Sequence, residues 1–249
     1  MLPVSDGKTP IALCIAPPNF FGDNEPARWM SLKYMNYTTP EIGSLSPQGM
    51  CWGNYGIDIE SISNLRKVYQ DGTSWGYHTA DWIIGTQNKI PTLFDENNNW
   101  NISILGSVNE YAVTDIDGKN KTDKLITTAN AQLNWRIDTT IDNSGGTNYA
   151  PAACCCVRYY TLGTNSNNWY LGAGGEMSII VVKRNDINIK LSAINAIYPN
   201  DCIASLDNKE YWTSTEDTNN NAYNINTEDG GIGGNDKGTN KNVIALLQY

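Results

Sequence analysis

The residues best suited to covalent or metal chemistry in this chain are its cysteines and its single histidine. Three of the six cysteines are consecutive, so their side chains point in different directions. This spacing fits neither a regular disulfide framework nor the Cys-x-x-Cys pattern of a zinc site. We therefore expect small buried thiols, because free cysteine is among the most buried residue types. The positions are Cys14, Cys51, Cys154, Cys155, Cys156 and Cys202.

Any Ser-His-Asp or Cys-His mechanism would have to use His78, which lies in an aromatic, turn-like stretch with no nucleophile motif nearby. Residues 115–118 (Asp-Ile-Asp-Gly) have the composition of a calcium loop but lack the spacing of an EF-hand, so they predict a turn. The sequence predicts no catalytic residue, no metal site and no cofactor. We do not expect an enzyme.

Charge and hydropathy argue against two classes of partner, nucleic acids and membranes. The 249 residues carry a formal net charge of -9, which argues against a nucleic-acid footprint of clustered lysine and arginine. No stretch approaches the ~18–20 apolar residues of a membrane span, so we expect no membrane insertion. Residues 1–20 lack a basic start and are interrupted by prolines, which argues against a signal peptide.

The elements that must position any site are short. Apolar or alternating runs predict strands at 10–16 and 27–35, and later at 210–213, 222–225 and 243–247. Helices are predicted at 57–70, from 122, from Pro151, and over 175–197 with a break at Asn185-Asp186. Without a repeat or a convincing linker, the chain reads as one α+β domain over 1–249, with short antiparallel strands, two to three helices and long irregular loops.

Four segments follow one another in a familiar order. They are Asn168–Met177, the stretch around Ile194–Ile197, Tyr211–Glu216 and a closing strand at 242–246. This order resembles the C-type-lectin fold in its formylglycine-generating-enzyme-like branch, with 53–120 as an insertion. Gly172 stands where the family usually has proline. The tryptophans of these motifs are expected to be scaffold, because an indole is a large apolar body with one N–H to satisfy.

The resemblance implies three different functions. Thiol oxidation would need a late pair of cysteines, and only Cys202 lies late in this chain. Calcium-dependent sugar binding would need Glu-Pro-Asn and Trp-Asn-Asp ligands, which are absent. The third function is that of variable proteins of diversity-generating retroelements, which bind receptors through a diversified C-terminal segment.

In that family the variable positions come just after the segment that corresponds to Tyr211–Glu216 here. They are encoded by asparagine codons whose adenines are randomised during copying. Substitution of the first two bases of such a codon never yields Lys, Glu, Gln, Met or Trp. Residues 217–242 obey this restriction except at Glu228, Lys237 and Lys241. An ordinary polar loop is the competing interpretation, because loops are also rich in Asn, Gly, Asp and Thr. With 205–249 as the variable region, the resemblance implies a ligand-binding set: Asp217, Thr218, Asn219, Asn220, Tyr223, Asn224, Asn226, Thr227, Asp229, Asp236, Thr239, Asn240 and Asn242.

Short polar side chains beside an aromatic anchor also resemble an antibody paratope, and Tyr223 is the expected anchor. The alternation of 223–226 is expected to turn Ile225 inward and to display Asn224 and Asn226. The expected partner is a host cell-surface protein or a glycan. The protein is expected to be part of a phage tail. It is expected to form a homo-oligomer such as a trimer, or to belong to a larger virion assembly. A bacterial surface adhesin fragment and a non-binding structural virion protein are the alternatives.

Overall fold

The computed structural model describes residues 2–3, 10–20, 24–57, 59, 115–128, 149–160, 164, 168–206, 209–228 and 231–249. Its first sheet has five strands in the order β1-β2-β3-β8-β4. Every adjacent pair in this sheet is antiparallel. The bounds are Leu2–Pro3 for β1, Pro10–Ala16 for β2, Arg28–Tyr34 for β3, Trp169–Leu171 for β4 and Ile244–Gln248 for β8.

Successive side chains of β8 point to opposite faces of this sheet and belong to two separate apolar clusters. In β8, Ile244 and Leu246 join one cluster, while Ala245 and Leu247 join the other. Successive side chains of a strand point to opposite faces, so a strand that is buried on both faces reads as a continuous apolar run. This explains why 10–16 and 243–247 are recognisable as strands, and both predictions are confirmed.

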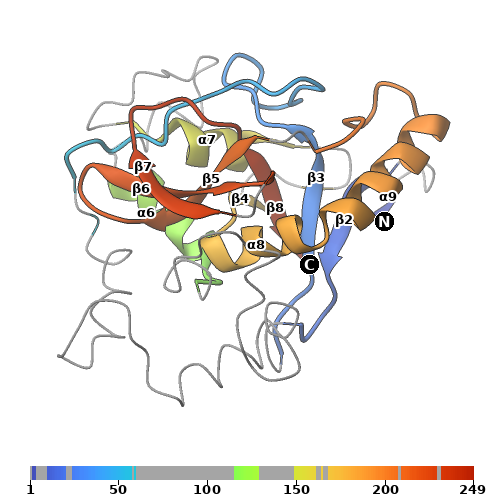
Figure 1. Ribbon diagram of the computed structural model, residues 1–249, viewed down its shortest axis with the longest axis horizontal. Coiled ribbons are helices and arrows are strands. Elements are labelled where there is room, and N and C mark those ends of the chain that lie inside the picture. The colour runs from blue at the N-terminus through green and yellow to red at the C-terminus, as the bar shows by residue number, and fades with distance from the viewer. Residues whose placement is uncertain are drawn as a thin grey trace.

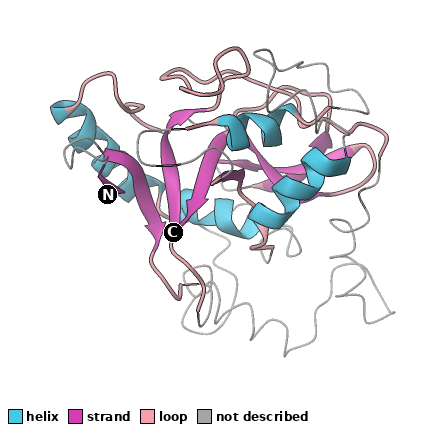
Figure 2. Ribbon diagram, turned by 180° about the vertical axis from the view of Figure 1, so that it is seen from behind, coloured by secondary structure: helices cyan, strands magenta, loops and turns pink. Residues whose placement is uncertain are grey.

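Four helices in the described part of the chain cover the two faces of this sheet. One cluster includes residues of α8 (Gly174–Val182) and α9 (Arg184–Ile197). The other includes residues of α6 (Gly118–Thr128) and α7 (Pro151–Arg158). Figure 1 shows β2, β3 and β8 side by side, with α9 extending past β2, and Figure 2 shows the same layers from behind.

A second, three-stranded sheet has the order β5-β6-β7 and is antiparallel throughout. Its strands are Glu210–Glu216 (β5), Asn221–Asn226 (β6) and Ile232–Asp236 (β7). It lies on the side of the first sheet away from β2 (Figure 1). The central strand β6 contributes Tyr223 and Ile225 to one cluster and Ala222 to the other, so its middle is enclosed on both faces.

Several expected boundaries shift. The 175–197 helix is two helices that meet at Lys183, two residues before the expected break, which gives four helices in the described part rather than two to three. The helix expected from 122 begins at Gly118. The strand β7 was not predicted, because Gly233 and Gly234 interrupt any apolar alternation. The expected helix at 57–70 and most of the expected insertion at 53–120 lie outside the described residues.

Candidate functional site

The motifs that carry the family resemblance are joined by buried polar contacts rather than arranged around a cavity. Glu176, in the first turn of α8, is fully buried. Its Oε1 accepts hydrogen bonds from Arg28 Nε at 2.6 Å and from Tyr170 Oη at 2.9 Å. Its Oε2 accepts the N–H of Ala173 at 3.0 Å. These bonds tie β3, β4 and the start of α8 together, so Glu176 acts as scaffold.

Burial raises the pKa of Glu176 to about 7, while Arg28, the Ala173 N–H and Tyr170 act in the opposite direction. No room is left beside this carboxylate. A Cβ on Gly118 would lie 2.3 Å from Glu176 Oε2 and 2.9 Å from the carbonyl oxygen of Leu171. A glycine is therefore required at the start of α6 because of close approach.

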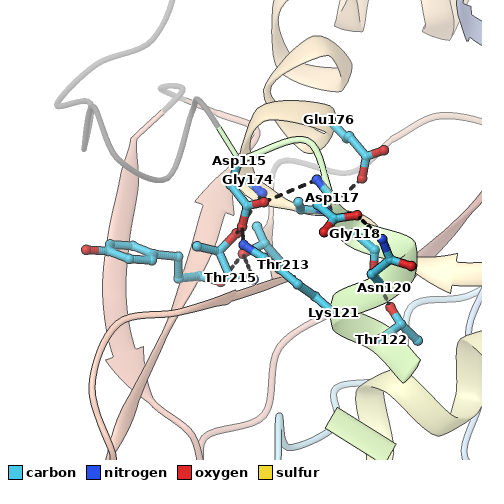
Figure 3. A network of polar contacts seen from close by, with 12 residues as sticks. Asp115, Asp117, Gly118, Asn120, Lys121, Thr122, Gly174, Glu176, Thr213 and Thr215 are labelled. Atoms are coloured by element: carbon cyan, nitrogen blue, oxygen red, sulfur yellow. Dashed lines mark hydrogen bonds and ion pairs between the residues drawn. The ribbon is translucent and has the colours of Figure 1, made fainter. Parts of the chain in front are cut away.

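The Asp-Ile-Asp-Gly segment packs into the same region, as Figure 3 shows. Asp115 is buried and forms an ion pair with Lys121. Thr215 Oγ1 donates to Asp115 Oδ2 at 2.5 Å and accepts the N–H of Gly174 at 3.0 Å. The Asp115 carboxylate is thus engaged by protein partners just before α6 begins at Gly118. Among the described residues, no group of three or more His, Cys, Asp or Glu could hold a metal ion.

The cysteine thiols offer little reactivity. All six are free, and five are buried, while Cys14 is half-buried. Cys154, Cys155 and Cys156 all lie in α7, and burial raises the pKa of the Cys155 and Cys156 thiols. Since the thiolate is the nucleophile, a raised pKa keeps these groups unreactive. His78 lies outside the described residues.

The structure divides the expected ligand-binding set. Asn219, Asn220, Asp236, Thr239 and Asn240 are exposed, while Asp217, Thr218 and Asn226 are partly exposed. Asp229 lies outside the described residues. The expectation of display is wrong for four members, which are buried: Tyr223, Asn224, Thr227 and Asn242.

The reason is the central position of β6 in its sheet. Tyr223 is only 3% exposed and packs in the core, so it cannot be an aromatic anchor for a ligand. Asn224 lies between two neighbouring strands, and its Oδ1 accepts a hydrogen bond from Asn235 Nδ2 at 2.5 Å. The inward orientation of Ile225 is confirmed, but Asn224 on the other side of the strand is covered as well. Thr227 Oγ1 bonds the carbonyl of Lys209, and the carbonyl of Asn242 accepts the N–H of Trp212.

The exposed members come together at one end of the second sheet. Asn221 pairs with Asp236, and the N–H of Lys237 donates to the carbonyl of Asn220 at 2.9 Å. The turn before β6 therefore lies beside the turn after β7. We define the β7 face as residues 217–220, 233–236 and 238–240. Asn226 lies at the opposite end of β6, so the structure does not place it in this group.

The buried Lys237 holds the β7 face from beneath. Lys237 is fully buried and ion-paired with Glu216. Its Nζ donates to the carbonyls of Asn219 at 2.9 Å and Ile57 at 2.8 Å, and lies 4.8 Å from the centre of the Trp52 ring. It thereby fixes the 217–220 turn against the chain near residue 57. Hydrogen bonds of this kind to a charged group are stronger than neutral ones.

Lys241, which follows the 238–240 turn, is held at the opposite end of β5 from Glu216. It is ion-paired with Glu210 and lies 5.5 Å from the centre of the Trp212 ring. Trp212 Nε1 donates to the carbonyl of Met50 at 2.8 Å, and Lys241 exchanges backbone hydrogen bonds with the same residue. The expectation that Trp169 and Trp212 are scaffold is confirmed by their complete burial.

Sequence reasoning missed the role of both lysines. The signal was present, since Lys237 and Lys241 are two of the three residues in 217–242 that asparagine codons cannot produce. Chemically, the β7 face presents amides, hydroxyls, carboxylates and bare backbone. Such groups can donate and accept hydrogen bonds to a ligand.

No family model and no curated protein matches this chain. Among solved structures it is similar to a fimbrial protein from Bacteroides ovatus ATCC 8483, at 16% sequence identity and a TM-score of 0.46. The match covers 90% of this chain and 36% of the fimbrial chain. No helix in the described part is both long enough and apolar enough to cross a membrane. The described chain is a mixed α and β protein with antiparallel sheets.

Proposed function

We propose that this chain is a receptor-binding domain and that the β7 face is its recognition surface. The observation that carries the proposal is the contrast between the outer and inner residues of this region. Small polar side chains and glycines lie outside, and the buried Lys237, ion-paired with Glu216 and 4.8 Å from the centre of the Trp52 ring, lies beneath them. Loops held on a fixed scaffold are where recognition usually lies.

The fold proposed with it is C-type-lectin-like, in the formylglycine-generating-enzyme-like branch. Support comes from the resemblance in sequence together with the contacts between its motifs. The Trp-Tyr-Leu motif forms β4 and leads into Glu176, and the Tyr-Trp motif forms β5. The carbonyl of Gly172 accepts the N–H of Ser214 at 2.9 Å, which joins the two motifs directly.

Diversification of the β7 face is part of the proposal, with a phage tail as the expected location and a bacterial cell surface as the alternative. The buried Lys237 and Lys241 fit it because a randomised segment needs constant residues in its scaffold. Sequencing this gene in several isolates tests the idea. Adenine-linked changes should concentrate at exposed positions such as Asn219, Asn220 and Asn240, with both lysines constant. Substitutions spread evenly over buried and exposed positions would contradict diversification.

Binding itself is tested with a triple variant, Asn219→Ala, Asn220→Ala and Asn240→Ala. Its matched control is Asn185→Ala with Ser192→Ala, two exposed polar changes on α9. Exposed changes of this kind usually alter stability by less than ~0.5 kcal/mol each. Labelled protein is incubated with a glycan array and with a panel of bacterial and animal cells. We expect attachment by the parent and the control, and a loss of attachment by the triple variant at an unchanged Tm. Equal attachment by all three proteins would refute the assignment of the β7 face.

Attachment of the parent protein to none of these targets would contradict a receptor-binding role.

A further inference from the structure

Among the described residues, the strand β7 has a hydrogen-bonded neighbouring strand on one side only. In the second sheet β6 lies between β7 and β5, so β7 forms the edge (Figure 1). Gly233, Gly234 and Asp236 are exposed and Asn235 is half-buried. An edge strand presents a row of unpaired N–H and C=O groups, which can template pairing with another chain.

The hydrogen-bond pattern shows which backbone groups point outward. Gly231 and Lys237, at the two ends of β7, bond inward to β6: Asn226 N–H donates to the Gly231 carbonyl, and Lys237 N–H donates to the Asn220 carbonyl. Antiparallel pairs alternate between bonded and non-bonded, so Gly233 and Asn235 also bond inward. The peptide groups of the alternate residues, Ile232, Gly234 and Asp236, therefore point away from the sheet.

Among the described residues, hydrogen bonds reach this outward row only at Asp236. The Asp236 carbonyl accepts the N–H of Thr239 at 3.0 Å, within the turn. In the described part of the structure, no hydrogen bond satisfies the N–H or C=O of Ile232 and Gly234 on the outer side. The outer edge of β7 thus offers two donors and two acceptors in line.

Three common obstacles to strand addition are absent from β7 itself. Natural edges are often blocked by proline, a bulge or an outward lysine. β7 contains no proline or lysine, its register with β6 is regular, and the lysine that follows it is buried. A Cβ placed on Gly233 would meet nothing within 4 Å, so side chains of an added strand have room there.

The chemistry of the edge identifies its occupant. Residues on one side of a strand repeat every ~6.6–6.8 Å, and another extended polypeptide matches that alternation of N–H and C=O groups. The charges near this edge favour a strand with cationic side chains. Asp236 is exposed at the end of β7, and Asp217 Oδ2 lies beside Gly234, at 2.4 Å from where a Cβ would stand. Lys237, which follows β7, is already ion-paired with Glu216.

We propose that the receptor contacts this chain through an extended polypeptide segment, with lysine or arginine at alternate positions, that adds a strand to the outer edge of β7. The inference rests on the proposed function and narrows it, because it selects a protein receptor over a glycan.

The test uses two variants of Gly234 that both add a Cβ but differ in whether the backbone N–H is kept. Gly234→Pro removes the outward N–H, while Gly234→Ala adds a Cβ against the same Asp217 oxygen and keeps the N–H. Asp217 Oδ2 is the end of a side chain that can rotate away, so both variants should fold, and circular dichroism checks this. The probes are peptides selected by the parent protein from a random-sequence phage-displayed library, resynthesised without the phage, and a glycan array.

We expect selected peptides rich in β-branched residues with alternating lysine or arginine. Gly234→Pro should weaken their binding at least about tenfold, and Gly234→Ala should not. A second measurement does not depend on any variant. N-methylation of the peptide at every other residue should abolish binding in one register and spare it in the other.

Several results would overturn the inference. Equal binding of the peptides by Gly234→Pro and Gly234→Ala would do so, as would loss of binding in both N-methylated registers or in neither. Glycan binding without any peptide binding would refute strand addition while leaving the β7 face as the recognition surface. Self-association of the parent protein that Gly234→Pro abolishes would assign the edge to a second copy of the chain instead.

Discussion

Replacing Lys237 with methionine tests whether the β7 face is held from beneath. The substitution keeps much of the side-chain volume but removes the cation, so the fully buried Glu216 loses its ion-pair partner. Breaking a buried pair on one side costs about 3–5 kcal/mol, because a charge is left uncompensated. The carbonyls of Ile57 and Asn219 also lose a charged donor at 2.8 and 2.9 Å.

The size of the effect follows from the length of the chain. At ~2–4 °C per kcal/mol for a domain of this size, Tm should fall by on the order of 10 °C. Lys209→Met is the matched control, since Lys209 is exposed, and its Tm should stay close to that of the parent. Differential scanning calorimetry measures both. Hydrogen exchange should in addition become faster in the 217–220 turn of the Lys237→Met protein.

The double variant Lys237→Met with Glu216→Gln separates charge from packing. If the uncompensated carboxylate dominates the loss, neutralising it should recover more than half of the lost stability. A Tm of Lys237→Met equal to that of the parent would refute the assignment of Lys237 as the support of this face. A double variant as unstable as the single one would show that the loss comes from packing and not from charge.

Three further changes test the scaffold. Trp212→Ala should lower the free energy of unfolding by ~3–5 kcal/mol, because the indole is fully buried; a Tm within a degree of the parent would contradict this. Gly118→Ala should lower the free energy of unfolding by ~1–3 kcal/mol, because the added Cβ overpacks against Glu176 and Leu171. Gly233→Ala should cost less, because a Cβ has open space there. Urea unfolding that ranks the two variants the other way would count against this packing. The third change concerns pH. Burial raises the pKa of Glu176 from 4.5 to about 7, so between these values the folded state binds more protons than the unfolded state, and stability falls as pH rises. Glu176→Gln should flatten this part of the stability profile measured by urea unfolding, and an unchanged slope would rule out Glu176 as its source.

Part of the fold could be predicted because local pattern and tertiary environment agree there. The strands at 10–16 and 243–247 are continuous apolar runs, and each is buried on both sides. Pro151 begins a helix as predicted, because its fixed φ and missing N–H suit the first turn. The strand β7 could not be predicted, since its middle residues are glycines that gain their conformation from pairing with β6.

At the candidate site, too, residue type alone did not predict which side chains are buried. Composition selected residues 217–242 as a polar, loop-like segment, but composition does not distinguish a central strand from an edge strand. Tyr223 and Asn224 are buried because β5 and β7 flank them, whereas Gly233 and Gly234 are exposed because nothing in the described structure pairs beyond β7.

The sequence by itself determined the strands and helices with strong periodicity, the buried cysteines and tryptophans, and the approximate position of the polar segment. These depend on hydrophobic pattern and residue type, which act locally. Only the tertiary structure decided which polar residues face water and which lysines are buried. Those outcomes depend on strand order and on partners far apart in the chain, such as Trp52 and Lys237, whose contact no local pattern encodes.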